Sequence, residues 1–252
     1  MSTPTRRLIL QQAVLAAGLP GTALLAVDSP AASPAKLRVV VTGGHPGDPE
    51  YGCGGTIARY SDLGHEVVLL YLNRGEGGIA GKPAEEVGAI RSGEARKACE
   101  LLGARPVFAA HTDGKAIVDQ GHYEQFHELL AAQKPDVVFA QWPIDGHADH
   151  RAISSLAYEA WLRMHKSFTF YYYEVTTGED TLQFAPTHYV DISVQAARKR
   201  SACFAHASQQ PERFYSIQEQ IAKFRGVESG HQQAEAFIRH VQSPDFQLPR
   251  RL

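Results

Sequence analysis

The chain of 252 residues has only three cysteines, Cys53, Cys99 and Cys203, and they lie far apart. This odd, widely spaced set forms neither a paired-thiolate zinc motif nor a disulfide framework, so each is expected to be a small buried apolar residue. The chain also lacks an excess of charge of one sign, since its formal net charge is −2. Without a basic surface, nucleic acid is not expected as a partner.

Long apolar runs are missing as well. The apolar part near the N-terminus, residues 8–26, is interrupted by Gly18, Pro20 and Gly21, so no integral membrane span is expected. A basic start containing Arg6 and Arg7, a moderately apolar middle and a small-residue exit are typical of an export signal, and paired arginines favour the twin-arginine route. We therefore predict that residues 1–35 direct export to the periplasm or the extracellular space; an uncleaved anchor is the alternative.

Residues 36–252, about 215 residues, have the right size for one α/β domain. Apolar residues in this part alternate between strand-like and helix-like spacing. The pattern predicts a single-domain, Rossmann-like α/β sheet, mostly parallel, with helices on both faces. Strands are expected at residues 37–42, 65–71, 106–110, 136–140, 168–174 and 187–192, and helices at residues 50–63, 84–102, 121–132, 150–165, 194–207 and 211–225.

Two polar clusters follow two of these strands. His45 and Asp48 come after the strand at 37–42, and His147, Asp149 and His150 come after the strand at 136–140. In an open α/β sheet, ligands bind at the carboxyl ends of the strands. Two histidines and one carboxylate, with positions left open for water, form a catalytic zinc arrangement. The sequence therefore predicts one divalent metal, while the alternative is that each histidine only orders a polar loop.

Glycines surround the end of the first strand, at Gly43 and Gly44 and again in residues 52–55. Their spacing does not form G-x-G-x-x-G, and a His-Pro pair interrupts the loop where backbone would have to approach a pyrophosphate. A nucleotide cofactor is therefore not expected. The glycines more simply allow a tight turn and close packing of the following helix.

The stretch from His45 to Thr56, HPGDPEYGCGGT, resembles the H-P-D-D-x-E-x-G-x-G-G-T motif of the LmbE-like, PIG-L-type de-N-acetylases. Residues 147–151, HADHR, resemble the H-P-D-H segment of the same family, and the resemblance continues through residues 73–77, 91–103 and 199–209. It implies a hydrolase, dependent on Zn²⁺ or another divalent metal, that removes the acetyl group from an N-acetylglucosamine-like substrate. A small amino-sugar conjugate is then the expected partner.

The resemblance also implies roles for individual residues. Carried over position by position, His45, Asp48 and His150 are the metal ligands. His147 protonates the leaving amine or stabilises the oxyanion, and Asp149 fixes the tautomer of His147. The alternative for His147 is a loop-ordering histidine.

Gly47 departs from the family motif. It replaces the first Asp of H-P-D-D, the carboxylate that the resemblance assigns as general base. General-base catalysis contributes ~10²–10⁴-fold in rate, so without a substitute the enzyme is slow or inactive. The candidates are Asp149, Asp145 and Glu50, and Glu50 is the weakest because supporting the loop or the helix start explains its presence.

Three further residues are predicted to contact substrate. Arg74 and Glu76 lie in a Gly-rich loop after the second strand, where binding loops collect. Arg91 lies near the expected cleft. The alternative for Arg91 is a solvated ion pair with Glu94, three residues further along the same helix. Two other functions remain open: a non-catalytic metal- or carbohydrate-binding protein, and a zinc amidase with a substrate that is not a sugar.

Overall fold

The computed structural model describes residues 36–244 and residue 249. The predicted export signal, residues 1–35, lies outside these residues, and so does its cleavage region. Among the described helices, none combines the length and the apolar character needed to cross a bilayer.

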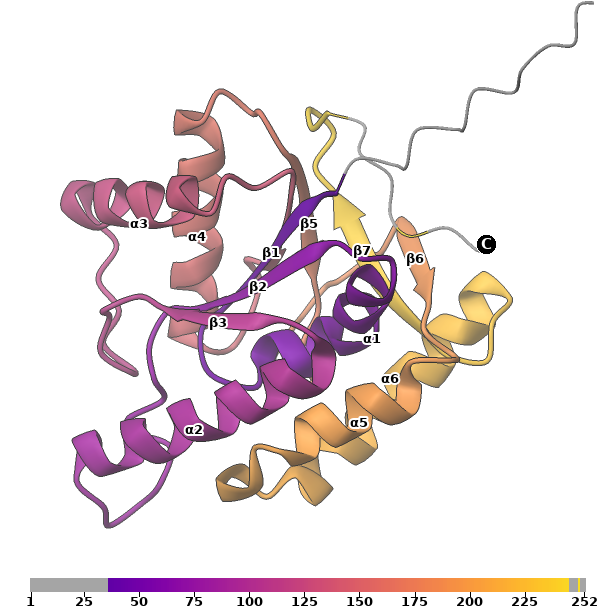
Figure 1. Ribbon diagram of the computed structural model, residues 1–252, viewed down its shortest axis with the longest axis horizontal. Helices are drawn as coiled ribbons and strands as arrows, with labels where there is room; N and C mark the ends of the chain where they lie inside the picture. The colour runs from indigo at the N-terminus through magenta and orange to yellow at the C-terminus, as the bar shows by residue number, and fades with distance from the viewer. Residues whose placement is uncertain (1–35, 245–248, 250–252) are drawn as a thin grey trace, which may run out of the picture. The chain divides into compact units, whose positions relative to one another are not determined.

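Seven strands form one sheet in the order β3-β2-β1-β4-β5-β7-β6 (Figure 1). The first five are parallel to one another, whereas β7 is antiparallel to both of its neighbours, β5 and β6. This arrangement confirms the predicted mostly parallel α/β sheet. The strands are β1 (Arg38–Gly43), β2 (Glu66–Tyr71), β3 (Arg105–Phe108), β4 (Val137–Gln141), β5 (Thr169–Tyr173), β6 (His188–Asp191) and β7 (Ala234–Arg239).

Helices cover both faces of the sheet, as predicted. Helices α3 and α4 lie on one face, and α1, α2, α5 and α6 lie on the other (Figure 1). Each face has its own buried apolar cluster. The helices are α1 (Asp48–Asp62), α2 (Ala84–Leu102), α3 (Gln120–Ala132), α4 (Ala148–Arg163), α5 (Ala196–Phe204) and α6 (Pro211–Ser229), with a short 3₁₀ helix, η1 (Ala207–Gln209).

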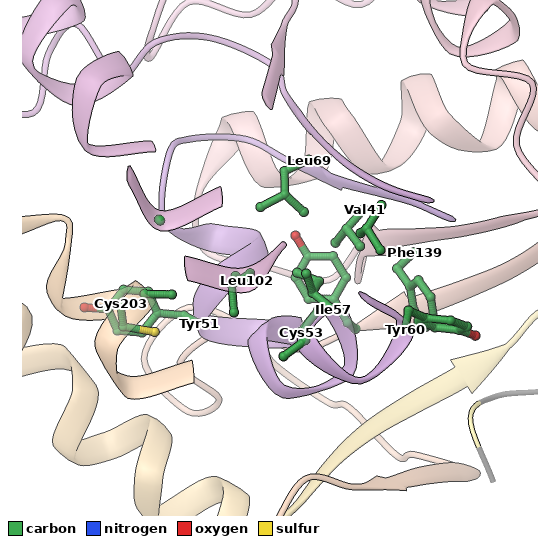
Figure 2. Packing of buried hydrophobic residues seen from close by; sticks show 14 of the residues in the cluster. Val41, Tyr51, Cys53, Ile57, Tyr60, Leu69, Leu102, Phe139 and Cys203 are labelled. Atoms are coloured by element: carbon green, nitrogen blue, oxygen red, sulfur yellow. The ribbon is translucent and has the colours of Figure 1, made fainter. Parts of the chain in front are cut away.

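The larger apolar cluster lies between the sheet and α1. Val41 and Leu69 point from the sheet toward Ile57 and Tyr60 of α1 (Figure 2), and all four side chains are at most 1% exposed. Fully burying side chains of this size stabilises the fold by about 1.5–3 kcal/mol each. The three cysteines are free and buried, in agreement with their predicted role.

Helix α1 packs unusually close to its neighbours because glycines face them. A Cβ atom at Gly52 would lie 2.3 Å from the Tyr173 ring, and one at Gly55 would lie 2.5 Å from Ile192. Real Cβ contacts are longer, so a side chain at either position would push the helix away from the sheet. This confirms that the glycine-rich stretch serves close packing.

The sheet places the two polar clusters side by side. Strand β1 pairs with β2 on one side and with β4 on the other, with Val41 in register with Phe139. The chain leaves β1 into α1 on one face and leaves β4 into α4 on the other face (Figure 1). Such a reversal in strand order opens a crevice at the carboxyl ends of the two strands.

Strand β7 is absent from the sequence-based prediction. It inserts between β5 and β6, so the strand expected at residues 187–192 lies at the edge of the sheet. Its Glu235 is 3% exposed and is paired with Lys199 of α5 at 2.6 Å. A buried glutamate obscures the strand pattern unless its distant partner is known.

Candidate metal and catalytic site

The loop between β1 and α1 is fixed from both sides. Gly44 N donates to Gln141 Oε1 at 2.8 Å, which joins the ends of β1 and β4. At the start of α1, Asp48 Oδ2 accepts a hydrogen bond from His45 N at 2.8 Å. The carboxylate of Asp48 is thereby held against the end of β1.

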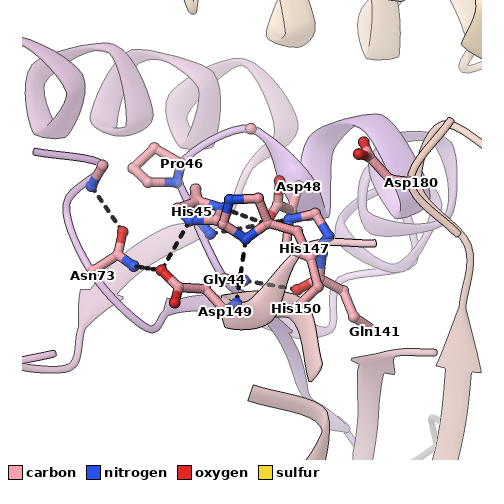
Figure 3. Close-up of polar contacts among 12 residues, drawn as sticks. Gly44, His45, Pro46, Asp48, Asn73, Gln141, His147, Asp149, His150 and Asp180 are labelled. Carbon is pink, nitrogen blue, oxygen red and sulfur yellow. Dashed lines mark hydrogen bonds and ion pairs between the residues drawn. The ribbon is translucent and has the colours of Figure 1, made fainter. Parts of the chain in front are cut away.

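Two imidazoles turn one nitrogen each toward this carboxylate. Asp48 Oδ2 lies 3.4 Å from His45 Nδ1 and 3.2 Å from His150 Nε2 (Figure 3). The structure thus brings together the three residues predicted as metal ligands, although they lie in segments about a hundred residues apart. All three residues are mostly buried.

The outer nitrogens of both rings face other carboxylates. His45 Nε2 lies 3.1 Å from Asp149 Oδ2 and 3.2 Å from Asp113 Oδ1, and His150 Nδ1 lies 3.0 Å from Asp145 Oδ1. Metal-binding histidines commonly donate their outer N–H to a carboxylate, which fixes the tautomer and makes the ring a better ligand. The donor set and its surroundings therefore fit a divalent cation held by His45, Asp48 and His150.

His147 lies beside this group as the N-cap of α4. Its ring centroid is 4.6 Å from that of His45 and 4.8 Å from that of His150. Nitrogen atoms of these three histidines also lie within 4.8 Å of one another, so His147 could serve as a further imidazole ligand. Its role as proton donor stays a prediction.

Asp149 orients His147 through its backbone and not through its carboxylate. Asp149 Oδ2 faces His45 and accepts a hydrogen bond from Asn73 Nδ2 at 2.9 Å (Figure 3). It also accepts one from Gly114 N at 2.8 Å. The backbone N–H of Asp149 donates instead to His147 Nδ1 at 3.2 Å. The proton of a neutral His147 therefore lies on Nε2, and the backbone of Asp149 rather than its carboxylate fixes this tautomer.

Charge pairing outweighs burial at His150 and Asp48, whereas burial is the main cause that lowers the pKa of His147. Burial alone would lower the pKa of His150, but the carboxylates of Asp48 and Asp145 outweigh it and raise the pKa to about 9. Burial likewise opposes ionisation of Asp48, yet His150 and His45 hold its pKa well below the usual range. Because a metal binds only deprotonated imidazole, cation uptake at neutral pH releases protons.

The three carboxylates considered as substitutes for the missing base are all engaged. Glu50 is fully buried and accepts from Gly47 N at 3.2 Å, Tyr71 Oη at 2.7 Å and His206 Nε2 at 2.9 Å. Asp145 accepts from His150 and, through Oδ2, from Thr181 Oγ1 at 3.0 Å. Burial opposes ionisation of Asp149, but its bonds to His45 and Gly114 lower its pKa to about 2, which makes it a poor proton acceptor.

Gly47 has a backbone that disfavours any side chain. Its φ is 114° and its ψ is −40°, although a Cβ atom would have space, with its nearest neighbour in the Tyr51 ring at 3.8 Å. We expect Gly47→Asp to lower the free energy of unfolding by about 1–3 kcal/mol, because a residue with a Cβ is strained at this φ. Urea unfolding measures the change.

The matched control is Gly93→Ala in α2, where a Cβ meets no atom within 4 Å. Equal stability of the Gly47→Asp variant and the native chain would show that the backbone at residue 47 is not strained by a side chain.

The predicted substrate residues separate into two groups. Arg74 pairs with Glu76 at 3.0 Å and with Glu85 at 2.8 Å, and neither Arg74 nor Glu76 lines the cleft. Arg91 does line it, but its buried guanidinium donates to Gly75 O at 3.2 Å and Pro46 O at 2.9 Å. Arg91 therefore holds two site loops together.

The alternative pairing of Arg91 with Glu94 is wrong. Glu94 instead accepts hydrogen bonds from the backbone and the hydroxyl of Ser208, at 2.7 and 2.8 Å. This contact ties α2 to the segment that follows α5. The two residues therefore form no ion pair in the described structure, although the charge of Glu94 still favours the charged form of Arg91.

An open cleft of 380 Å³ lies over the site and is lined by His45, Asp48, Arg91, Asp113 and His147, among others. The sequence interpretation missed Asp113. It follows β3, so a search for carboxylates after every strand would have found it. Its pKa is lowered mainly by the hydrogen bond to His45.

The fold and site define an α/β protein with a His/Asp group, at the carboxyl edge of its sheet, that could hold a divalent cation. A family model described as GlcNAc-PI de-N-acetylase (PIG-L) matches residues 40–161. The chain is 30% identical over 223 residues to the diacetylchitobiose deacetylase of Thermococcus kodakarensis, covering 78% of this chain and 80% of that protein. The chain belongs to the PIG-L (LmbE-like) family.

Solved structures agree with this assignment. The N,N'-diacetylchitobiose deacetylase from Pyrococcus horikoshii superposes with a TM-score of 0.72 at 26% identity, covering 80% of this chain and 83% of that chain. A 4-carboxy-2-hydroxymuconate hydratase from Pseudomonas putida superposes with a TM-score of 0.74 at 22% identity, covering 83% and 98%. At that identity the hydratase shares the fold alone, so fold by itself does not define the reaction.

Proposed function

We propose that this protein is a deacetylase, dependent on Zn²⁺ or another divalent metal, that hydrolyses the N-acetyl group of a GlcNAc-like sugar. The observation that carries the proposal is the convergence of His45 Nδ1 and His150 Nε2 on Asp48, while the outer nitrogen of each ring faces another carboxylate. The 30% identical relative is a diacetylchitobiose deacetylase, which supports an amino-sugar substrate.

A divalent cation at this group would supply Lewis acidity to polarise the amide carbonyl and activate water. The residues of the chain provide the remaining parts. His147 carries its proton on Nε2 when neutral, because Nδ1 accepts from the backbone of Asp149. To donate a proton to the leaving nitrogen, His147 must first be protonated and its Nδ1 must give up the hydrogen bond from Asp149 N. Arg91 keeps the Pro46 and Gly75 loops in place beside the cleft.

One observation favours a second function. Gly47 leaves the opening motif without the carboxylate that the family resemblance assigns as general base, and the nearby Glu50, Asp145 and Asp149 are engaged in other contacts. A protein that binds a metal or a carbohydrate without hydrolysis is consistent with this loss. An amidase with a substrate that is not a sugar would use the same site.

The test is acetate release by the purified protein, with and without added Zn²⁺. We expect metal-dependent release from N-acetylglucosamine or N,N'-diacetylchitobiose, with N-acetylated amino acids as the matched non-sugar substrates. The His147→Ala variant should lose about 10²–10⁴-fold in turnover if His147 is the proton donor. Release from the amino acids alone would support the amidase, and no release by a metal-loaded protein would support the binding protein.

Export is a further part of the proposal. The paired Arg6 and Arg7, followed by a moderately apolar segment, support a route that carries folded proteins. A metal site assembled from segments about a hundred residues apart requires a folded chain. Folding and metal loading before export are therefore compatible with the twin-arginine route.

A further inference from the structure

A second cavity opens beside Gly47, on the side of Asp48 that faces α6. It has a volume of 130 Å³ and is lined by Gly47, Asp48, Tyr51, Thr176 and Asp180, among others. A Cβ atom at Gly47 would point toward Tyr51 and His206, both of which line this space. The cavity therefore adjoins the position that a carboxylate at residue 47 would occupy.

Asp180 reaches this cavity from the loop between β5 and β6. Its main chain pairs with the segment that leads to His147, since Gly146 N donates to Asp180 O at 2.9 Å. The next residue, Thr181, donates its hydroxyl to Asp145 Oδ2 at 3.0 Å, and Asp145 in turn accepts from His150. In the view of Figure 3, Asp180 lies beyond Asp48, away from Asn73 and Asp149.

Hydrogen bonds tie the loop that carries Asp180 to α6. Thr176 has a φ of 39°, an unfavourable value for a β-branched residue. Its N–H donates to Gln218 Oε1 at 3.3 Å, and its hydroxyl donates to Asp180 Oδ2. Glu174, at the start of the loop, is clamped by the Arg225 guanidinium at 2.7 and 2.8 Å. Residues of α6 thus position Thr176 and Glu174, and Thr176 in turn orients the Asp180 carboxylate.

Asp180 also differs electrostatically from the other carboxylates of the site. Burial raises the pKa of Asp180 above its ordinary value, and Asp48 and Asp145 add to this effect, while the Thr176 hydroxyl and His150 oppose it. Asp149 and Asp48, in contrast, have lowered pKa values because of their histidine neighbours. In the described part of the chain, the Asp180 side chain makes one hydrogen bond, through Oδ2, so Oδ1 is left to accept a proton.

We propose that Asp180 is the general base of this protein and replaces the carboxylate that is missing at residue 47. This inference rests on the proposed function. Asp180 lines the cavity beside Gly47 and Asp48, whereas Glu50, Asp145 and Asp149 are each hydrogen-bonded to other partners. The general-base carboxylate then lies on the β5–β6 loop and not on the β1–α1 loop. Asp180 is then a catalytic residue that contacts the attacking water.

Hydrolysis of an N-acetyl amide consumes one water molecule. The water oxygen forms a bond to the carbonyl carbon while one water proton moves to Asp180. The C–N bond then breaks, its electron pair stays on nitrogen, and the nitrogen takes a proton from charged His147. The second water proton remains on acetic acid, and transfer of a proton from Asp180 to His147 through solvent restores both groups. The products are acetic acid and the free amine.

The test compares Asp180→Asn and Asp180→Ala with the native chain, using acetate release from N,N'-diacetylchitobiose. We expect kcat to fall by ~10²–10⁴-fold in both variants, while bound zinc and the unfolding temperature stay near the native values. Added formate should restore activity to Asp180→Ala in a concentration-dependent manner, because a small carboxylate can occupy the emptied cavity. A residue that only shapes the loop would give no such rescue.

Glu179→Gln is the matched control, since this neighbouring carboxylate is 43% exposed and 3.9 Å from Arg213; its activity should stay within about twofold of native. If the native chain releases acetate and Asp180→Asn retains that activity, the inference is overturned and the deacetylase function stands. The same conclusion follows if the variant loses its zinc together with its activity. If the metal-loaded native chain releases no acetate, the proposed function fails and the inference falls with it.

Discussion

Alanine at Asp48 or at His150 is expected to reduce bound divalent metal from about one equivalent to less than about one tenth after dialysis. Changes to residues that merely support a ligand cost about 10–100-fold in metal affinity, so removal of a ligand should cost more. The two imidazole nitrogens also lose the carboxylate on which they converge when Asp48 is replaced. Metal analysis by mass spectrometry measures the content, and deacetylase activity should fall with it.

The matched control is His122→Ala. This partly exposed histidine lies at the start of α3 and is paired with Asp119 at 2.7 Å. Its replacement should leave metal content near the native value. Near-native zinc in both Asp48→Ala and His150→Ala would contradict the ligand assignment, and His147, whose ring lies within 4.8 Å of the His150 ring, would become the first alternative.

A second large effect is expected from Lys199→Ala, which should lower the free energy of unfolding by about 3–5 kcal/mol. Lys199 is 2% exposed, and its ammonium lies 2.6 Å from Glu235 Oε1. Glu235 also accepts from the backbone N–H groups of Gly55 and Thr56 at 2.8 and 2.7 Å. Without Lys199, a buried carboxylate is left with no opposing charge, so its contacts with α1 weaken.

Thermal unfolding measures this change. At about 2–4 °C per kcal/mol for a domain of this size, the unfolding temperature should fall by roughly 6–20 °C. Lys97→Ala, on the exposed face of α2, is the control and should change it by no more than about 2 °C, since surface substitutions stay within about 0.5 kcal/mol. A similar small change for Lys199→Ala would show that the buried pair contributes little.

Much of the fold follows from local sequence patterns. Helix α2 begins and ends where the sequence predicts. Its end is set by Gly103, which adopts a left-handed conformation with a φ of 70°. Strands β1, β2 and β4 are short apolar runs that a parallel sheet buries on both faces. Strand β7 was not predicted because a charged Glu235 does not fit a buried strand pattern. Its partner, Lys199, is 36 residues away in the sequence.

The site was predictable in its residue types and less so in its contacts. His45, Asp48 and His150 could be found because each follows a strand that ends at the same edge of the sheet. The partner of the Asp149 carboxylate could not, since the turn at the start of α4 directs it toward His45 and turns its backbone N–H toward His147. Asp180 follows no predicted strand end directly, and the pairing of its loop with residues 144–146 brings it to the site.

Pro106 has a consequence for how the protein behaves at high concentration. Strand β3 is one edge of the sheet, and Pro106, in register with Leu69, has no N–H to offer to a further strand. The other edge, β6, is only four residues long. Proteins limit aggregation through short edge strands, proline and charge, and Arg105 adds an exposed cation beside Pro106. Neither edge therefore offers a long, regular template on which another chain could extend the sheet.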